Sequence, residues 1–130
     1  ATASPSVFEA ADGRGVIAIA GTELLAGPAD GTGATRPARR GESLVLYATG
    51  LGRRAAATVR VVVDGWEVEP SFTGPAGGHA GVHEVRFHLP EGAPLGAVVP
   101  VYLKVTFEEA GSSRAALSNA VKLPVEAERE

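Results

Sequence analysis

Three histidines come nearest, by type and spacing, to forming a metal site in this chain. His79, His83 and His88 fall within ten residues of one another. Side chains along a strand alternate between its two faces, so His83 and His88, five positions apart, point to opposite faces of a regular strand. His79 lies in a segment rich in glycine, proline and alanine and can join only one of them. We therefore predict two surface imidazoles and one at the edge of the core, and we assign no metal ligand.

Hydroxyl and carboxyl groups are numerous, but their pattern is not that of an enzyme. Nucleophilic catalysis needs a hydroxyl beside a base that an acid orients. The G-x-S-x-G elbow is absent, and Ser112 and Ser113 fall in a predicted hairpin tip. Fifteen acids are enough for a glycosidase pair, yet most of them occupy predicted turns or outward strand positions. We predict a protein that is not an enzyme, without catalytic or cofactor-binding residues.

Two Asp-Gly segments supply oxygen atoms of the kind that calcium binds. They are Asp12-Gly13 and Asp30-Gly31-Thr32-Gly33. Calcium takes about six to eight oxygen ligands, and neither segment is an EF-hand loop or a calcium-binding β-roll repeat. Ordinary Asp-Gly turns explain both segments equally well. The sequence therefore leaves calcium binding open and assigns no cofactor.

One set of residues has the types needed for an isopeptide crosslink, in which a lysine joins an asparagine beside a buried acid. These are Lys104, Lys122 and Asn119. Lys104 alternates with Leu103 and Val105, which places it on the outward face of its predicted strand. An outward amine stays charged and unreactive. We expect two solvated lysines and an asparagine that closes the last turn.

Trp66 is the only tryptophan, and aromatic residues make up 5% of the chain. Counted back from Phe72 at a period of two, Trp66 shares a face with Val68 and Phe72, which favours burial. A carbohydrate platform is the alternative, although such sites usually stack several aromatic rings. We predict that Trp66 belongs to the core and keep carbohydrate binding, through loops 73–81 and 108–114, as an alternative.

The elements that position these residues are predicted to be β-strands. Seventeen glycines and nine prolines interrupt the sequence at short intervals, and between them lie β-branched runs with a period of two, which is typical of a sandwich or barrel. No segment has a convincing helical period. The predicted strands are 16–19, 43–48, 58–63, 66–72, 82–89, 98–107 and about 119–125. Their number and spacing predict an all-β fold, an Ig-like β-sandwich of about seven strands.

Two local signals and one long connection refine this prediction. Asp64-Gly65 between two β-rich runs predicts a hairpin, because both central residues of a type I′ turn need positive φ. Pro100 lacks a backbone donor and should lie at a strand start or on an edge. A polar hairpin tip is predicted over 108–114, and a mostly irregular connection over 22–41.

Length and composition indicate one domain. A chain of 130 residues can bury a continuous core, and 45% hydrophobic residues are too many for a disordered segment. We assign residues 1–10 to an N-terminal segment or first edge strand, 11–125 to the Ig-like sandwich and 126–130 to a charged tail. The chain has no methionine and starts at Ala1, so we expect a processed mature protein or a piece of a longer one.

Charge and cysteine content exclude several classes of partner and chemistry. The net charge of −3, from 15 acidic and 12 basic residues, gives no reason to expect nucleic acid. No apolar run approaches the roughly 18 residues that cross a bilayer, so no membrane insertion is expected. The chain contains no cysteine, which excludes disulfides, thiolate metal sites and cysteine nucleophiles.

Several segments, in order along the chain, resemble one known family. The most specific is LYATGLG at 46–52, and the others are Pro5 to Phe8, Arg36 to Gly41, Val61 to Gly65, Thr73 to Gly77, Val85 to Pro90 and Pro100-Val101. Together they resemble the Ig-like domain of unknown function found at the C-termini of many secreted proteins of Solibacter-type acidobacteria. The resemblance covers nearly the whole chain and implies an extracellular, non-catalytic module similar to IPT-type immunoglobulin domains. It carries over no site residues.

The chain departs from this family in two places. His83 stands where an aromatic residue is usual, and the tip at 108–114 is longer than the short Gly-Gly turn expected there. The second departure leaves room for a contact made by the tip.

These observations favour a non-catalytic structural, adhesion or domain-docking module that is secreted or lies on the cell surface. Its expected partners are adjacent domains of a parent protein or other envelope and extracellular proteins. An alternative is a filament subunit that self-assembles by strand addition, with Val7 and Phe8 pairing with a neighbour's sheet edge. The preferred interpretation of these two residues is packing within the chain as a first strand. A third alternative is a carbohydrate-binding module.

Overall fold

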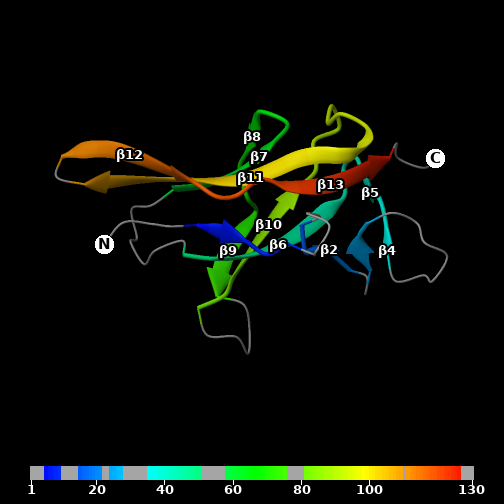
Figure 1. Cartoon of the computed structure of the whole chain (residues 1–130), viewed down its shortest axis with the longest axis horizontal. Helices are drawn as coiled ribbons and strands as arrows, with labels where there is room; N and C mark the ends of the chain where they lie inside the picture. The colour runs from blue at the N-terminus through cyan, green and yellow to red at the C-terminus, as the bar shows by residue number, and fades with distance from the viewer. Residues whose placement is uncertain are drawn as a thin grey trace.

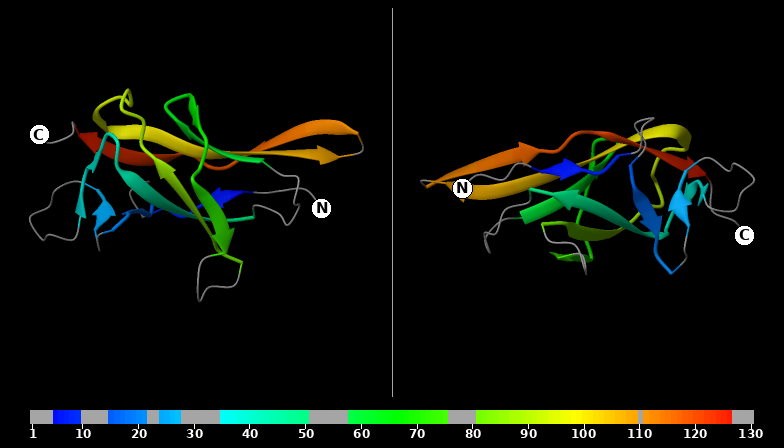
Figure 2. Two further views of the ribbon diagram at one scale, coloured as in Figure 1. Left: turned by 180° about the vertical axis from the view of Figure 1, so that it is seen from behind. Right: turned by 60° about the horizontal axis from the view of Figure 1, so that its bottom comes forward.

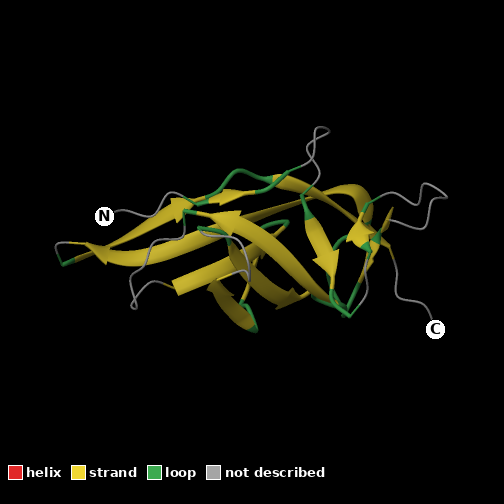
Figure 3. Cartoon of the chain, turned by 90° about the horizontal axis from the view of Figure 1, so that it is seen from below, coloured by secondary structure: helices red, strands yellow, loops and turns green. Residues whose placement is uncertain are grey.

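The computed structural model describes residues 5–9, 15–21, 24–27, 35–50, 58–75, 81–109 and 111–126. These residues form thirteen strands and no helix. The strands make two sheets that lie one above the other (Figure 1, Figure 3). The predicted all-β sandwich is therefore confirmed. No helix in the described part of the chain has the length and apolar character of a membrane span.

The first sheet has seven strands. Their order is β4 (Thr35–Arg36), β3 (Leu25–Ala26), β2 (Ile17–Ile19), β6 (Ser43–Thr49), β10 (His83–His88) and β9 (Phe72–Pro75), with β1 (Ser6–Val7) paired to the end of β6. Most neighbours are antiparallel, and β3 with β4 is parallel. Strand β9 lies at one edge of this sheet.

The second sheet has six strands. Their order is β5 (Ala38–Arg39), β13 (Val121–Glu126), β11 (Gly96–Glu109), β7 (Thr58–Val63) and β8 (Trp66–Val68), with β12 (Ser112–Leu117) also paired to β11. Strand β13 ends at Glu126, the first residue of the expected charged tail. Residues 127–130 lie outside the described part.

The core fills the space between the two sheets with aliphatic side chains and one large aromatic ring. In β10, Val85 and Phe87 are fully buried while Arg86 and His88 are exposed, as the alternation predicted. In β11, Val101, Leu103 and Val105 are fully buried and face them from the other sheet. No polar or charged residue in the described part is buried, so burial of apolar area provides the main driving force for this fold.

The hairpin at Asp64-Gly65 is confirmed. Strand β7 ends at Val63, β8 begins at Trp66, and the two residues between them have φ of 48° and 87°. Positive φ at both central positions is what a type I′ turn requires, and it matches the twist of the flanking strands.

Pro100 is the fifth residue of β11, a strand with neighbours on both sides, so the expected place at a strand start is wrong. Its carbonyl accepts a hydrogen bond from the Asp64 N–H at 2.9 Å, and pairing between β7 and β11 begins one residue later, at Val63 and Val101. The backbone N and O of one residue point to the same side of an antiparallel strand. The missing donor therefore faces the hairpin turn, beyond the end of β7.

Two regions expected to be irregular contain strands. Strands β3, β4 and β5 occur in the described parts of 22–41. Each has only two residues, too few to show an alternating pattern. The expected tip at 108–114 is mostly strand, because β11 runs to Glu109 and β12 starts at Ser112. Beyond Thr106 only β12 pairs with β11 in the described structure, and this two-stranded arm extends past the rest of the sandwich (Figure 2).

The N-terminal strand is tied to both sheets. Val7 is 2% exposed and pairs with Ala48 of β6. The Asn119 side chain bonds the same residue twice, because Oδ1 accepts from the Val7 N–H at 2.8 Å and Nδ2 donates to the Val7 carbonyl at 3.0 Å. Intramolecular packing of this segment as a first strand is confirmed for Val7, whereas Phe8 is partly exposed.

Candidate binding surfaces

The histidines do not converge. His83 lies two residues before buried Val85 and therefore on the same, core side of β10. It is half-buried, and its Nδ1 atom has no hydrogen-bond partner among the described atoms. His88 lies on the outward face, where Nδ1 and Ser43 Oγ are 3.1 Å apart. Their predicted opposite orientation is confirmed. His79 lies outside the described residues, within which no group of three or more His, Cys, Asp or Glu could hold a metal ion.

The other candidates for chemistry are also separated. Lys104 points outward and forms an ion pair with Glu67 at 3.1 Å, as its alternation predicted. Asn119 holds Val7 instead of closing a turn. Ser112 and Ser113 are exposed residues of β12. Both Asp-Gly segments considered for calcium, 12–13 and 30–33, lie outside the described residues.

An ion pair with shifted pKa values lies where the chain crosses from the first sheet to the second. Arg36 donates to both carboxylate oxygens of Glu42, at 3.0 and 2.6 Å, and the Arg39 N–H donates to one of them at 2.6 Å. The hydrogen bonds from Arg36 are the largest cause of a lowered pKa of Glu42, and the bond from the Arg39 N–H adds to it, whereas burial acts in the opposite direction. Glu42 in turn raises the pKa of Arg36. The arrangement stabilises the crossing and offers no group poised for proton transfer.

The prediction that Trp66 belongs to the core is wrong. Trp66 is 60% exposed. The count from Phe72 fails because β8 ends at Val68 and the chain then passes to the other sheet, where Phe72 starts β9 and faces outward. A period of two does not continue across such a bend. The indole instead lies beside Gly92, where an added Cβ would be 3.5 Å from its Cη2 atom.

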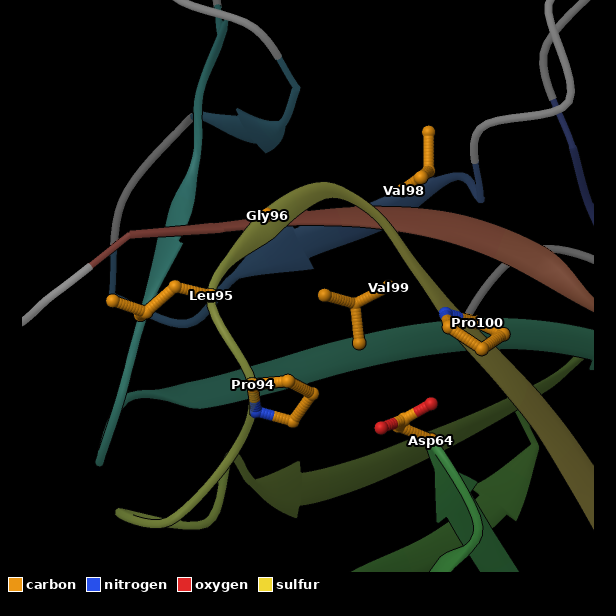
Figure 4. Close-up of a pocket in the computed structure, with 7 residues that line it drawn as sticks. All are labelled: Asp64, Pro94, Leu95, Gly96, Val98, Val99 and Pro100. Carbon is orange, nitrogen blue, oxygen red and sulfur yellow. The ribbon is translucent and has the colours of Figure 1, made fainter.

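An open hollow of about 150 Å³ with a mainly apolar lining includes Asp64, two residues before this tryptophan in the same hairpin (Figure 4). The lining residues are Asp64, Pro94, Leu95, Gly96, Val98, Val99 and Pro100. Leu95 and Val98 are 51% and 62% exposed. The carboxylate of Asp64 is the only charged group of the lining, and in Figure 4 it points toward Val99 and Pro100. We call Trp66, Leu95, Val98 and this hollow the apolar end.

A second hollow lies on the outward face of the first sheet. It has a volume of about 250 Å³ and is lined by Phe72, Glu84 and Arg86. Arg86 Nε lies 3.3 Å from Glu84 Oε2, and its Cζ atom lies 6.0 Å from the centroid of the Phe72 ring. Phe72 is 46% exposed. We call these three residues the Phe72 face.

Sequence reasoning did not identify the Phe72 face. One local signal was present, because Phe72 and Gly74 are two apart and so share one face of a strand. Glu84 and Arg86 come from the neighbouring strand, and only the register of β9 with β10 brings them to this ring.

Comparison with protein-family models, curated proteins and solved structures found no match to this chain. The resemblance to the acidobacterial Ig-like domain therefore stays a prediction from the sequence.

Proposed function

We propose that this chain is a non-catalytic, immunoglobulin-like structural module, secreted or on the cell surface, that docks a neighbouring domain or an extracellular protein. The apolar end carries this proposal. A secreted location is supported only by the family resemblance.

The apolar end has the composition of a protein contact. Leu95 and Val98 line one hollow and are each more than half exposed, and Trp66, two residues after the lining residue Asp64, is 60% exposed. Grouped exposed apolar residues mark interaction sites, whereas single ones are normal. Covering such a surface contributes about 25 cal/mol for each Å² of apolar area removed from water, and a tryptophan at the centre of a contact commonly dominates its binding energy.

The hollow also restricts what fits. Its volume of about 150 Å³ is below the roughly 300 Å³ at which drug-sized pockets begin, so it accommodates a single side chain of a partner. Asp64 at its border favours a partner that carries lysine or arginine next to that apolar side chain.

Selection from a displayed random-peptide library, with the whole chain immobilised, tests this proposal. We expect enriched peptides to combine an apolar residue with an adjacent basic one. Trp66→Ser should weaken their binding by about tenfold or more, because the central anchor is lost. Leu117→Ser is the matched control, because Leu117 is also 60% exposed but lies on β12, and it should leave the affinity unchanged. Equal binding by Trp66→Ser and the unaltered chain, or no enrichment at all, would contradict the proposal.

A further inference from the structure

The tip of the Phe72 ring occupies space that a side chain at position 74 would need. A Cβ built on Gly74 would lie 2.8 Å from Phe72 Cζ and 3.2 Å from Cε2. The first distance is too short for a real contact, so only glycine allows the ring to occupy this place. The ring lies against Gly74, and Phe72 is still 46% exposed. Strand β9 lies at the edge of the first sheet (Figure 1), and its Phe72 offers an exposed aromatic side chain on the outward face.

A carboxylate and a guanidinium border this side chain. In the register of β9 with β10, Phe72 is opposite Arg86 and Gly74 is opposite Glu84. Both charged side chains therefore lie on the same outward face as the ring. They bond each other at 3.3 Å, and all three residues line the hollow of about 250 Å³.

These groups together match the chemistry of a sugar ring. An aromatic face packs against the apolar C–H face of a pyranose. The carboxylate accepts hydrogen bonds from hydroxyl groups and the guanidinium donates to their oxygens. The volume lies below that of drug-sized pockets, which fits one ring of a longer glycan.

The charges further restrict the ligand. Glu84 and Arg86 offset each other within the hollow, so neither sign is favoured overall. A carboxylate beside the ring repels an acidic sugar, and a guanidinium at the same place repels a cationic one. We propose that the Phe72 face binds a neutral pyranose unit of a polysaccharide.

This site is separate from the proposed docking surface. It lies on the first sheet and uses neither Trp66 nor the hollow at residues 94–100. Covering Gly74 with an aromatic ring also stabilises an edge strand by itself. That role explains the place of the ring but not the ion pair beside it.

Affinity electrophoresis of the whole chain through gels containing a neutral β-glucan, galactomannan or α-glucan tests the proposal. We expect at least one neutral polysaccharide to retard the chain, and polygalacturonate to leave its mobility unchanged. Phe72→Ala should weaken the apparent affinity by about tenfold or more, and Glu84→Gln by a smaller factor. Trp66→Ala is the matched control and should bind as the unaltered chain does, which separates this site from the apolar end.

A second variant distinguishes loss of the binding ring from unfolding of the chain. Phe72→Leu keeps an apolar cover over Gly74 but removes the flat ring, so it should fold, as shown by thermal melting, and still lose retardation. The proposal is overturned if no neutral polysaccharide retards the unaltered chain, or if only polygalacturonate does. Retention of binding by Phe72→Leu would overturn it as well. The same holds if Trp66→Ala loses binding while the Phe72 variants keep it.

Discussion

Two exposed aromatic side chains, Trp66 and Phe72, each lie against a glycine, yet their surroundings differ. An added Cβ at Gly92 would meet the indole at an ordinary 3.5 Å, whereas one at Gly74 would clash with the phenyl ring at 2.8 Å. Trp66 follows by two residues Asp64, the single carboxylate of an apolar hollow, whereas Phe72 itself lines a hollow with an ion pair. We propose a protein contact at one surface and a sugar site at the other because of the neighbours of each ring, not because of the ring itself.

The largest expected effect separates surface rings from core rings. Phe87 is fully buried, and Phe87→Ala should lower the free energy of unfolding by about 3–5 kcal/mol through lost burial and a cavity. Trp66→Ala should lower it by less than about 1 kcal/mol, because most of the indole already contacts water. Urea denaturation of both variants measures the difference. A loss of several kcal/mol in Trp66→Ala would show that the indole supports the core.

A smaller effect should distinguish the two glycines. Gly74→Ala forces the Phe72 ring to move and should cost about 1 kcal/mol, the low end of the range for an inserted methyl group, because the exposed ring can move toward solvent. Gly92→Ala meets only ordinary contacts and should change stability by less than about 0.5 kcal/mol. Thermal melting gives the stabilities, and NMR shifts of the Phe72 ring protons report its displacement. Equal costs for both substitutions would mean that the two rings are held in the same way.

The smallest effect is the pH dependence of folding stability. It must be known before binding at the two surfaces is compared at different pH values. The pKa of Glu42 is lower in the folded chain than its ordinary value of 4.5. The Arg36–Glu42 pair therefore stabilises the fold above that value, and its contribution is lost as pH falls through the lower folded pKa. At pH 7, Glu42→Gln should cost about 1 kcal/mol, the scale of a hydrogen bond to a charged group after partial solvent screening.

Denaturation of the unaltered chain and of Glu42→Gln at pH 7 and pH 3 checks this expectation. The difference between the two proteins should shrink at the lower pH. A difference that grows on acidification would contradict the assigned direction of the pKa shift.

Local patterns predicted much of the fold. The alternation around Val85 and Phe87 identified β10 and its buried face, and the Asp64-Gly65 pair identified a hairpin together with its turn type. Both features depend on residues close in the chain, because pleating and turn geometry are set by the backbone itself. The opposite orientation of His83 and His88 followed from the same alternation.

The sequence predicted the proposed binding surfaces less well than the fold. The alternation count that assigned Trp66 to the core ran across the passage between sheets after Val68, where face assignments restart. The strands at 25–26, 35–36 and 38–39 are too short to show an alternating pattern. The parallel pairing of β5 with β13 also joins residues far apart along the chain.

The sequence by itself determined the all-β class, the principal strands, the tight hairpin and the absence of cysteine chemistry, because each depends on residue type and local spacing. The tertiary structure alone decided that Trp66 is exposed beside Gly92 and that Leu95 and Val98 line an apolar hollow. It also decided that Glu84 and Arg86 border Phe72. The physical reason is that a surface is formed by strand register and by the crossing between sheets, which bring together residues that no local pattern connects.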